Sequence, residues 1–269
     1  MEPCDHESSE VFTDGAVRVG KHPALVDDAK RIQRLIDDER EWTSSPAAAE
    51  VYTRFHVRRF DTTYHQCCQL APDTNSVVCD VGRGPFTQRL AQRYAEVWSL
   101  GFALDADDGG HREQSELPGV RHIPFDLNRS IDVASWPAER NKFDLIVCAE
   151  TIEHLHTPPE FTLMMLGSLL KPTGQLLITT PNAAGITRRL KLLLGIHPYE
   201  RIRYFAENPG HFREYTRKEL IDVGHKAGLV VRDCRTLNFY KQGLVDWLKL
   251  PPAFRDSLVA VYSRADGSA

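Results

Sequence analysis

Short apolar runs alternate with stretches of helical spacing along most of the chain. The runs predict strands over residues 77–81, 97–105, 120–126, 143–150, 175–181, 229–233 and 257–263. The helical spacing predicts helices over 87–94, 159–170, 218–227 and 244–250. Strands that alternate with helices favour a mostly parallel sheet with right-handed crossovers, in which ligands bind beyond the carboxyl ends of the strands. The pattern therefore predicts an α/β fold.

The chain before the first predicted strand has two parts. Residues 1–22 are polar with scattered small residues, which is typical of a disordered or loosely attached segment. Across residues 23–72, apolar residues recur at helical spacing in two stretches, one ending near Glu41 and one running from about Pro46 to Leu70. We expect this amino-terminal helical cap to cover the sheet or one side of a ligand site. The alternative is that its helices only pack against the α/β domain of residues 73–269.

The first strand is followed by a turn of small residues and then by a helix. The strand VVCDV leads into Gly82-Arg83-Gly84, and this order of strand, glycine turn and helix opens many nucleotide-binding α/β folds. The glycines allow a sharp turn and a close ligand approach. Asp80, near the end of the strand, can accept hydrogen bonds from a cationic or hydroxylated ligand.

Four carboxylates fall at or just past predicted strand ends: Asp80, Asp105, Asp126 and Glu150. The carboxyl ends of parallel strands meet at one edge of the sheet. We therefore expect these carboxylates to border a common ligand site.

Composition narrows the class of protein further. The 269 residues carry a formal net charge of −4, which gives no global attraction to nucleic acid or anionic lipid. The six cysteines show neither disulfide nor zinc spacing, no apolar run reaches membrane-spanning length, and the first residues lack the apolar core of a signal peptide. We expect a cytoplasmic protein.

Residues 183–210 interrupt the strand–helix alternation as an insertion that mixes leucines with basic residues. Such a basic amphipathic segment is typical of a lid, of a peripheral membrane contact through residues 184–205, or of a subunit contact that would form a homodimer. A packed helix with a solvated basic face explains the same pattern.

Four motifs follow one another along the chain: VVCDVGRGPF, FDLIVCAETIEHL, LLKPTGQLLITTPN and HFREYTRKEL. Together they resemble class I S-adenosylmethionine-dependent methyltransferases, above all the branch of ubiquinone-biosynthesis O-methyltransferases and of methyltransferase domains from bacterial glycan and natural-product pathways. The resemblance spans Asp73 to Ser263. It implies a Rossmann-like sheet of seven strands, mostly parallel with an antiparallel last strand, and helices on both faces. It also implies S-adenosylmethionine as cofactor and a small-molecule acceptor.

The resemblance assigns roles to individual positions. It implies that the turn of Asp80, Gly82, Arg83 and Gly84 holds the aminocarboxypropyl end of the cofactor, that Asp126 and Leu127 face the adenine, and that Ala149 and Glu150 lie near the cofactor. Two positions depart from the family pattern. The acid that binds the ribose is expected near Gly101 or Phe102, whereas Asp105 comes later, so either Asp105 takes this role or the contact is absent. Arg83 stands where the family often has a small residue.

An acid and histidine cluster carries the remaining chemistry. If the segment after the fourth strand is helical, Glu150, Glu153 and His154 share one face, and the resemblance implies that His211 folds over the same site. In similar quinone and small-RNA O-methyltransferases this set is associated with a divalent metal, and its donors suit Mn²⁺, Fe²⁺ or Zn²⁺ and, less well, Mg²⁺. The alternatives are a catalytic pair in which His154 acts as general base beside Glu153, and a purely structural role.

The function expected from the sequence is O-methylation of a phenolic, quinone-like or sugar hydroxyl. RNA 2′-O-methylation is the alternative that the metal-like set permits, and the negative charge argues against a nucleic-acid partner. A non-catalytic methyltransferase-like subunit is a third reading, and N-methylation of an amine also stays open.

Overall fold

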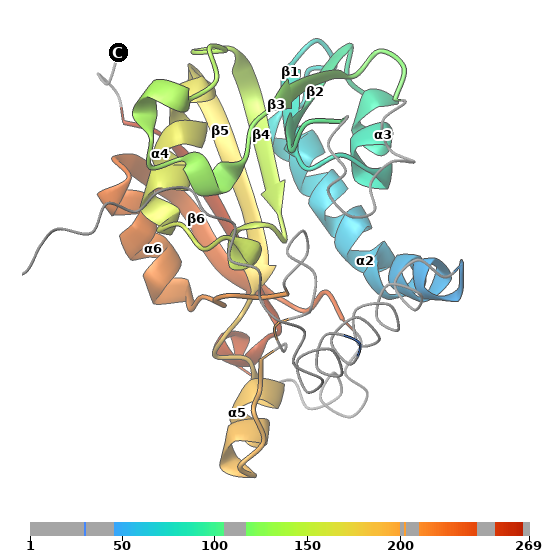
Figure 1. Cartoon of the computed structure of the whole chain (residues 1–269), viewed down its shortest axis with the longest axis vertical. Coiled ribbons are helices and arrows are strands. Elements are labelled where there is room, and N and C mark those ends of the chain that lie inside the picture. Colours follow the sequence, from blue (N-terminus) through green and yellow to red (C-terminus); the bar gives the residue numbers. More distant parts are fainter. Residues whose placement is uncertain are drawn as a thin grey trace, which may run out of the picture.

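The computed structural model describes residue 30 and residues 46–104, 117–199, 202, 210–240 and 251–265, with no side chains for 46–56. The strands are β1 (Val77–Val81), β2 (Glu96–Gly101), β3 (Arg121–Pro124), β4 (Phe143–Ala149), β5 (Leu170–Pro181), β6 (Leu229–Leu237) and β7 (Ser257–Arg264). The helices are α2 (Pro46–Leu70), α3 (Pro85–Ala91), α4 (Pro159–Leu169), α5 (Ile186–Leu193) and α6 (Arg217–Lys226) (Figure 1). Short 3-10 turns add η2 (Leu127–Arg129), η3 (Val133–Ser135), η4 (Ile152–His154) and η5 (Pro252–Phe254).

The seven strands form one sheet in the order β3-β2-β1-β4-β5-β7-β6. β7 runs antiparallel to both of its neighbours, and the pairs among β1 to β5 are parallel. The predicted Rossmann-like sheet with an antiparallel last strand is therefore confirmed. Its carboxyl-end edge brings together the ends of β1 and β4, where the sequence places its carboxylates.

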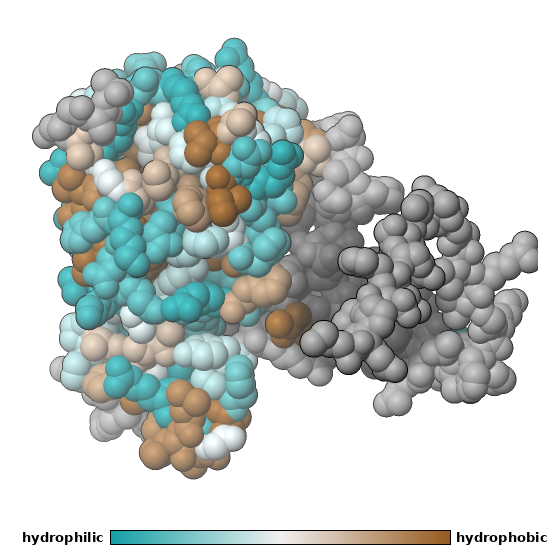
Figure 2. Space-filling model, turned by 60° about the vertical axis from the view of Figure 1, so that its left-hand side comes forward, coloured by the Kyte–Doolittle hydropathy of each residue, from teal (hydrophilic) through white to brown (hydrophobic). Residues whose placement is uncertain are grey.

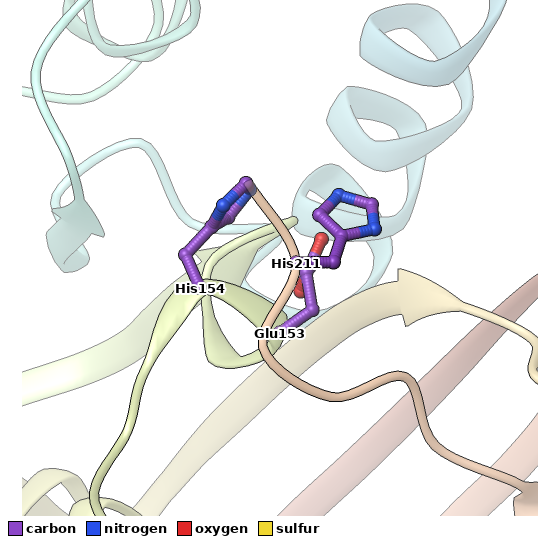
Figure 3. A group of neighbouring side chains, drawn as sticks. All are labelled: Glu153, His154 and His211. Atoms are coloured by element: carbon purple, nitrogen blue, oxygen red, sulfur yellow. The ribbon is translucent and has the colours of Figure 1, made fainter. Parts of the chain in front are cut away.

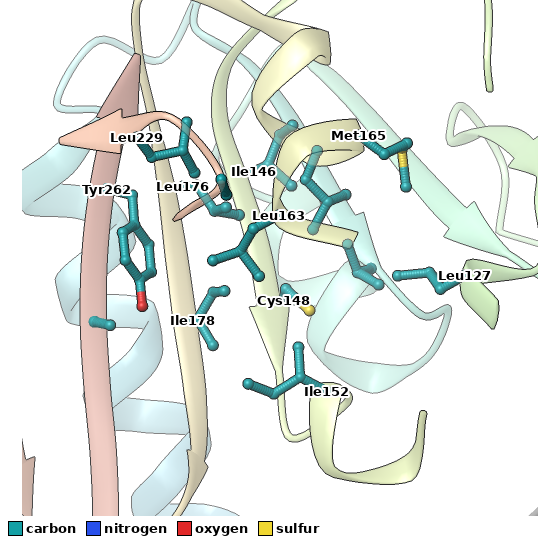
Figure 4. Packing of buried hydrophobic residues seen from close by; sticks show 14 of the residues in the cluster. Leu127, Ile146, Cys148, Ile152, Leu163, Met165, Leu176, Ile178, Leu229 and Tyr262 are labelled. Atoms are coloured by element: carbon teal, nitrogen blue, oxygen red, sulfur yellow. The ribbon is translucent and has the colours of Figure 1, made fainter. Parts of the chain in front are cut away.

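The sheet is buried on both faces by separate apolar clusters. On one face, α4 and α6 pack through a cluster that includes Ile146, Leu163 and Tyr262 (Figure 4). On the other face, α2 and α3 pack against β1 and β4 through Cys67, Leu90 and further buried residues. Near-continuous apolar strands such as FDLIVCA are what a sheet covered on both sides requires.

The helix expected from Pro46 to Leu70 is present as α2 and lies against the sheet. The Tyr94 hydroxyl donates to the carbonyls of Cys67 and Ala71, and the Phe60 and Phe86 rings stack with centroids 5.9 Å apart. Of the earlier helix expected over residues 23–41, only Lys30 lies within the described residues. The helix expected over 244–250 lies outside them.

β2 is shorter than the strand predicted over residues 97–105. It ends at Gly101, which pairs with Pro124 of β3. The last bond of this ladder runs from the Phe125 N–H to the Gly101 carbonyl over 2.6 Å. The segment beyond Gly101 therefore leaves the sheet earlier than the apolar run suggested. Asp105 lies outside the described residues.

No helix among the described residues is both long and apolar enough to cross a membrane. The five cysteines within the described ranges are free thiols, as their spacing predicted.

Close packing between α6 and β7 yields a stability prediction. A Cβ at Gly224 would lie 2.4 Å from Cε1 of the fully buried Tyr262 ring, whose hydroxyl is held by the Leu220 carbonyl. We expect Gly224→Ala to lower the free energy of unfolding by about 1–3 kcal/mol, because overpacking outweighs the better helix propensity of alanine. Chemical denaturation measures the change.

Gly167→Ala in α4 is the matched control. There the nearest atom is the terminal Cδ2 of Leu229, which can move aside, so we expect a smaller loss. A Gly224→Ala protein as stable as the wild type would contradict the packing described here.

Candidate active site

The end of β1 buries a carboxylate with one hydroxyl partner. Asp80 is 5 % exposed, and its Oδ2 accepts a 2.6 Å hydrogen bond from the Thr87 hydroxyl at the start of α3. Burial raises the pKa of Asp80 to about 7, against the lowering effect of the Thr87 hydrogen bond. The carboxylate is therefore poised to ionise fully when a cation arrives beside it.

The turn after β1 has the conformation that its glycines permit. Gly82 has a φ of +110°, donates its N–H to the Leu100 carbonyl over 2.8 Å, and has open space where a Cβ would stand. Gly84 has extended backbone, and its N–H donates to the Thr87 hydroxyl at the start of α3. The turn thus presents backbone rather than side chains beside Asp80.

Arg83 points from this turn toward β2. Its Nη1 donates to the Ser99 hydroxyl over 2.9 Å, and Ser99 Oγ lies 2.8 Å from Nδ1 of His122. His122 Nε2 lies 2.7 Å from the Phe102 carbonyl, which can only accept, so Nε2 carries the proton and Ser99 donates to Nδ1. Burial lowers the pKa of His122, which is consistent with this neutral ring. The unusual arginine is therefore part of a network at the end of β2.

The remaining positions assigned to the cofactor lie along the same edge of the sheet. Asp126 follows β3 and caps η2, with its Oδ1 accepting from the Asn128 N–H, while Leu127 is buried. Ala149 is half-buried at the end of β4. The structure thus places Asp126 just after β3 and Ala149 at the end of β4, which are the strands that the sequence indicated.

Glu150 departs from the helical geometry considered for the segment after β4. Its φ of +51° is left-handed, which is uncommon outside glycine, and the 3-10 turn η4 begins only at Ile152. The Glu150 carboxylate accepts from the Thr179 hydroxyl over 3.0 Å and lies 3.7 Å from Nη1 of Arg59. Burial raises the pKa of Glu150, and the Arg59 charge opposes this rise. Glu150 is therefore directed to α2 and β5 and does not share a helical face with Glu153.

Glu153 is fully buried with only one of its carboxyl oxygens satisfied. Oε2 accepts from the Thr180 hydroxyl over 2.8 Å, whereas Oε1 has no hydrogen-bond partner among the described residues. Burial raises the pKa of Glu153 well above its usual value, and the charge of Glu150 adds to this effect. The carboxyl group therefore favours its protonated form until a cationic partner offsets the burial.

Two histidines from distant parts of the chain lie beside Glu153 (Figure 3). The rings of His154 and His211 meet edge to face with centroids 4.8 Å apart. His154 Nδ1 lies 2.9 Å from the Gly210 carbonyl, and His211 Nδ1 lies 3.0 Å from Oε1 of Glu214. Since both partners are acceptors, each Nδ1 carries a proton, which leaves Nε2 as the nitrogen of each ring that can bind a proton or a metal.

Glu153, His154 and His211 together form a group whose donor atoms lie within 4.8 Å of one another. Its chemistry fits a divalent cation, because one carboxyl oxygen is unpartnered and both imidazoles have the Nδ1 hydrogen bonds typical of metal-bound histidine. The same atoms can receive a proton. Of the four residues considered as metal ligands, Glu150 is the one outside this group.

The sequence analysis gave no role to several residues at this edge. Arg59 of α2 reaches Glu150, and nothing in the pattern of its helix marks it. Thr87 bonds Asp80, and its place three residues after Gly84 is a signal that a capping analysis would find. Glu214 is bound by both Arg188 and His211, and its place in the motif HFREYTRKEL, three residues after His211, is the signal that could have found it.

A comparison with known protein families shows to which family this chain belongs. A family described as a methyltransferase domain matches residues 52–233, more than half of the chain. The chain belongs to this methyltransferase family. It is an S-adenosylmethionine-dependent methyltransferase with the class I fold that the motifs predicted. The resemblance to the ubiquinone O-methyltransferase branch stays a prediction.

Solved structures share the fold of this methyltransferase at low sequence identity. An S-adenosylmethionine-dependent methyltransferase from Clostridium acetobutylicum is 15% identical with a TM-score of 0.52, covering 81% of this chain and 98% of that one. In Haloferax volcanii, a protein assigned as a methyltransferase and solved with the activator Trm112 is 12% identical with a TM-score of 0.54, covering 84% and 97%. The [4+2]-cyclase SpnF is 13% identical with a TM-score of 0.50, covering 76% and 82%. The fold alone therefore does not fix the reaction. No curated protein matches the sequence.

The hydrogen bond between Thr87 and Asp80 yields a testable pKa shift. Thr87 donates to the carboxylate and so lowers the pKa of Asp80, so we expect Thr87→Val to raise that pKa above about 7. Carboxyl ¹³C NMR titration, with Asp80→Asn as the assignment reference, measures the value. Thr180→Val, which removes a like bond from Glu153, is the control and leaves the Asp80 titration in place. An unchanged or lowered pKa in Thr87→Val would contradict the assignment.

Proposed function

We propose that this methyltransferase transfers the methyl group of S-adenosylmethionine to a hydroxyl of a small phenolic, quinone-like or sugar acceptor. The observation that carries the proposal is the group of Glu153, His154 and His211 beside the carboxyl-end edge of the sheet. An acceptor hydroxyl must lose a proton as it is methylated, and the half-buried imidazoles of this group can accept one.

In this proposal the cofactor occupies the edge formed by β1, β3 and β4. Asp80 and the glycine turn of Gly82 and Gly84 hold the aminocarboxypropyl end, Arg83 flanks it, Asp126 and Leu127 face the adenine, and Ala149 and Glu150 lie near the sulfonium. The open space at Gly82 and the single-hydroxyl partner of Asp80 support this arrangement. Asp105 is kept as the proposed ribose contact.

The proposed transfer balances without a further reactant. The acceptor oxygen attacks the methyl carbon, the carbon–sulfur bond breaks, and S-adenosylhomocysteine leaves with the electron pair. The hydroxyl proton moves to Nε2 of His154, because its Nδ1 is already protonated toward the Gly210 carbonyl. Glu153, next to His154 in η4, lies beside the imidazolium that forms and keeps its own protonation state in this step.

A bound divalent cation is a second way to promote loss of the acceptor hydroxyl proton. Glu153, His154 and His211 would hold it, and a bound cation would lower the pKa of the acceptor hydroxyl. The unpartnered Oε1 of Glu153 supports this candidate, since a cation would offset the burial of its charge. Glu150 remains the fourth proposed ligand, although it is directed to Arg59 and Thr179.

Binding of the cofactor should depend on pH through Asp80. Because the pKa of Asp80 is raised to about 7, the carboxylate is mostly ionised at pH 8 and mostly protonated at pH 6. We expect the affinity for S-adenosylmethionine to fall by about tenfold over this interval. Isothermal titration calorimetry measures it. Asp80→Asn should bind more weakly and with little pH dependence, and a wild-type affinity that does not change with pH would contradict the role of Asp80.

The acceptor class is tested by turnover of the wild type and of variants of the group. We expect release of S-adenosylhomocysteine with phenols, hydroquinones or sugars, and a loss of about 10²- to 10⁴-fold in kcat for Glu153→Gln and His154→Asn. His225→Asn, at an exposed position of α6, is the control. Turnover with amines alone would overturn O-methylation.

Metal binding is measured separately from turnover, by Mn²⁺ electron paramagnetic resonance on metal-stripped protein. Equal loss of Mn²⁺ binding and of turnover in Glu153→Gln and His211→Asn would support a shared cation. If the wild type does not bind Mn²⁺, and if Glu153→Gln and His211→Asn lose turnover to different extents, the result would identify His154 as a base that acts without a metal.

A further inference from the structure

α5 projects from the body of the protein with its leucines in solvent. It follows the end of β5 and forms the lowest lobe of the molecule, where apolar side chains gather (Figures 1 and 2). Leu193 is 82 % exposed and Leu194 73 %, and Leu190, Leu192 and Ile196 are exposed as well. No residue of α5 is buried. Contacts with the core therefore do not explain why this helix is apolar.

The orientation of α5 is fixed by its basic side. Arg188 is bidentate to the buried Glu214 carboxylate, and Arg189 donates to the Ala184 carbonyl and lies 5.0 Å from the Phe254 ring centroid. Helical spacing places Ile186, Leu190 and Leu193 on the side away from Arg188. The protein thus holds the polar side of the helix and presents its apolar side outward, the reverse of an ordinary packed helix.

A basic cleft adjoins this helix. It has a volume of about 540 Å³ and lies between α5, the start of α6, the end of β6 and η5. Five of its lining residues are cationic and none is acidic: Arg189, Arg217, Lys218, Arg235 and Arg255. Arg235 pairs with Asp233 over 3.1 Å, and the other four cations have no carboxylate partner among the described residues. Such a gathering of positive charge, in a chain whose formal net charge is −4, indicates an anionic partner.

The two features are continuous, because Arg189 belongs to α5 and also lines the cleft. Residues 183–199 contain three arginines or lysines and no acid. A twofold contact with a second copy of the chain would bring these like charges together. A bilayer takes up exposed leucines without a matching surface, and its phosphates pair with the cations beside them.

We propose that α5 and the basic cleft form a docking surface for a membrane that contains anionic phospholipid. The leucines of α5 enter the acyl boundary while the cleft binds headgroup phosphates. This surface goes beyond the proposed methyl transfer and does not depend on it.

The test is sedimentation of the full chain with vesicles of phosphatidylcholine alone, or with roughly one third phosphatidylglycerol. We expect binding at least about tenfold tighter to the anionic vesicles. Leu193→Glu combined with Leu194→Glu should abolish it. Lys218→Gln combined with Arg235→Gln should weaken it by roughly fivefold for each cation removed.

Matched controls change an exposed apolar residue and an exposed cation away from this surface. Ile131→Glu and Lys226→Gln should bind vesicles like the wild type. The thermal unfolding midpoint of every variant, measured first, shows that it is folded.

Three outcomes would overturn the proposal. The first is equal or absent binding to the two kinds of vesicle, or wild-type binding by the α5 and cleft variants. The second is a concentration-dependent dimer that Leu193→Glu with Leu194→Glu abolishes, which would assign the surface to a second copy. The third is binding of inorganic phosphate in the cleft without any binding to vesicles.

Discussion

Burial of carboxyl groups at one edge of a parallel sheet is the constraint on which this structure depends. Asp80, Glu150 and Glu153 have lost most of their contact with water, and for each of them burial is the largest cause of a raised pKa. Each carboxyl is kept in place by a threonine hydroxyl, and Glu150 also by Arg59. The protein places too little positive charge beside these buried carboxylates to offset their loss of hydration, so this edge of the sheet favours cationic ligands.

The fold could be predicted from the sequence because each strand carries its own apolar signal. VVCDV and FDLIVCA are short, almost wholly apolar and separated by helical stretches, which leaves few arrangements other than a parallel sheet. The end of β2 could not be placed in this way. It depends on the neighbouring strand β3, whose last bond to β2 runs from the Phe125 N–H to the Gly101 carbonyl.

The candidate site was predictable to the extent that its residues share one motif. Asp80 and the glycine turn lie within a few residues, and their order alone indicated a ligand-binding turn. The partners of these residues come from elsewhere, as with Arg59 from α2 and Ser99 from β2. The left-handed backbone of Glu150 is set by its bonds to Thr179, so helical periodicity could not foresee its direction.

Glu214 connects His211 at the candidate site with α5 on the outer surface. One of its oxygens accepts from His211 and both accept from Arg188, so a single buried carboxylate fixes an imidazole beside Glu153 and a helix on the outer surface. Thermodynamic linkage between such sites is reciprocal. A ligand that holds His211 in its present orientation therefore also stabilises the present position of α5. Restraint of α5 in that position stabilises the present orientation of His211 by the same coupling free energy.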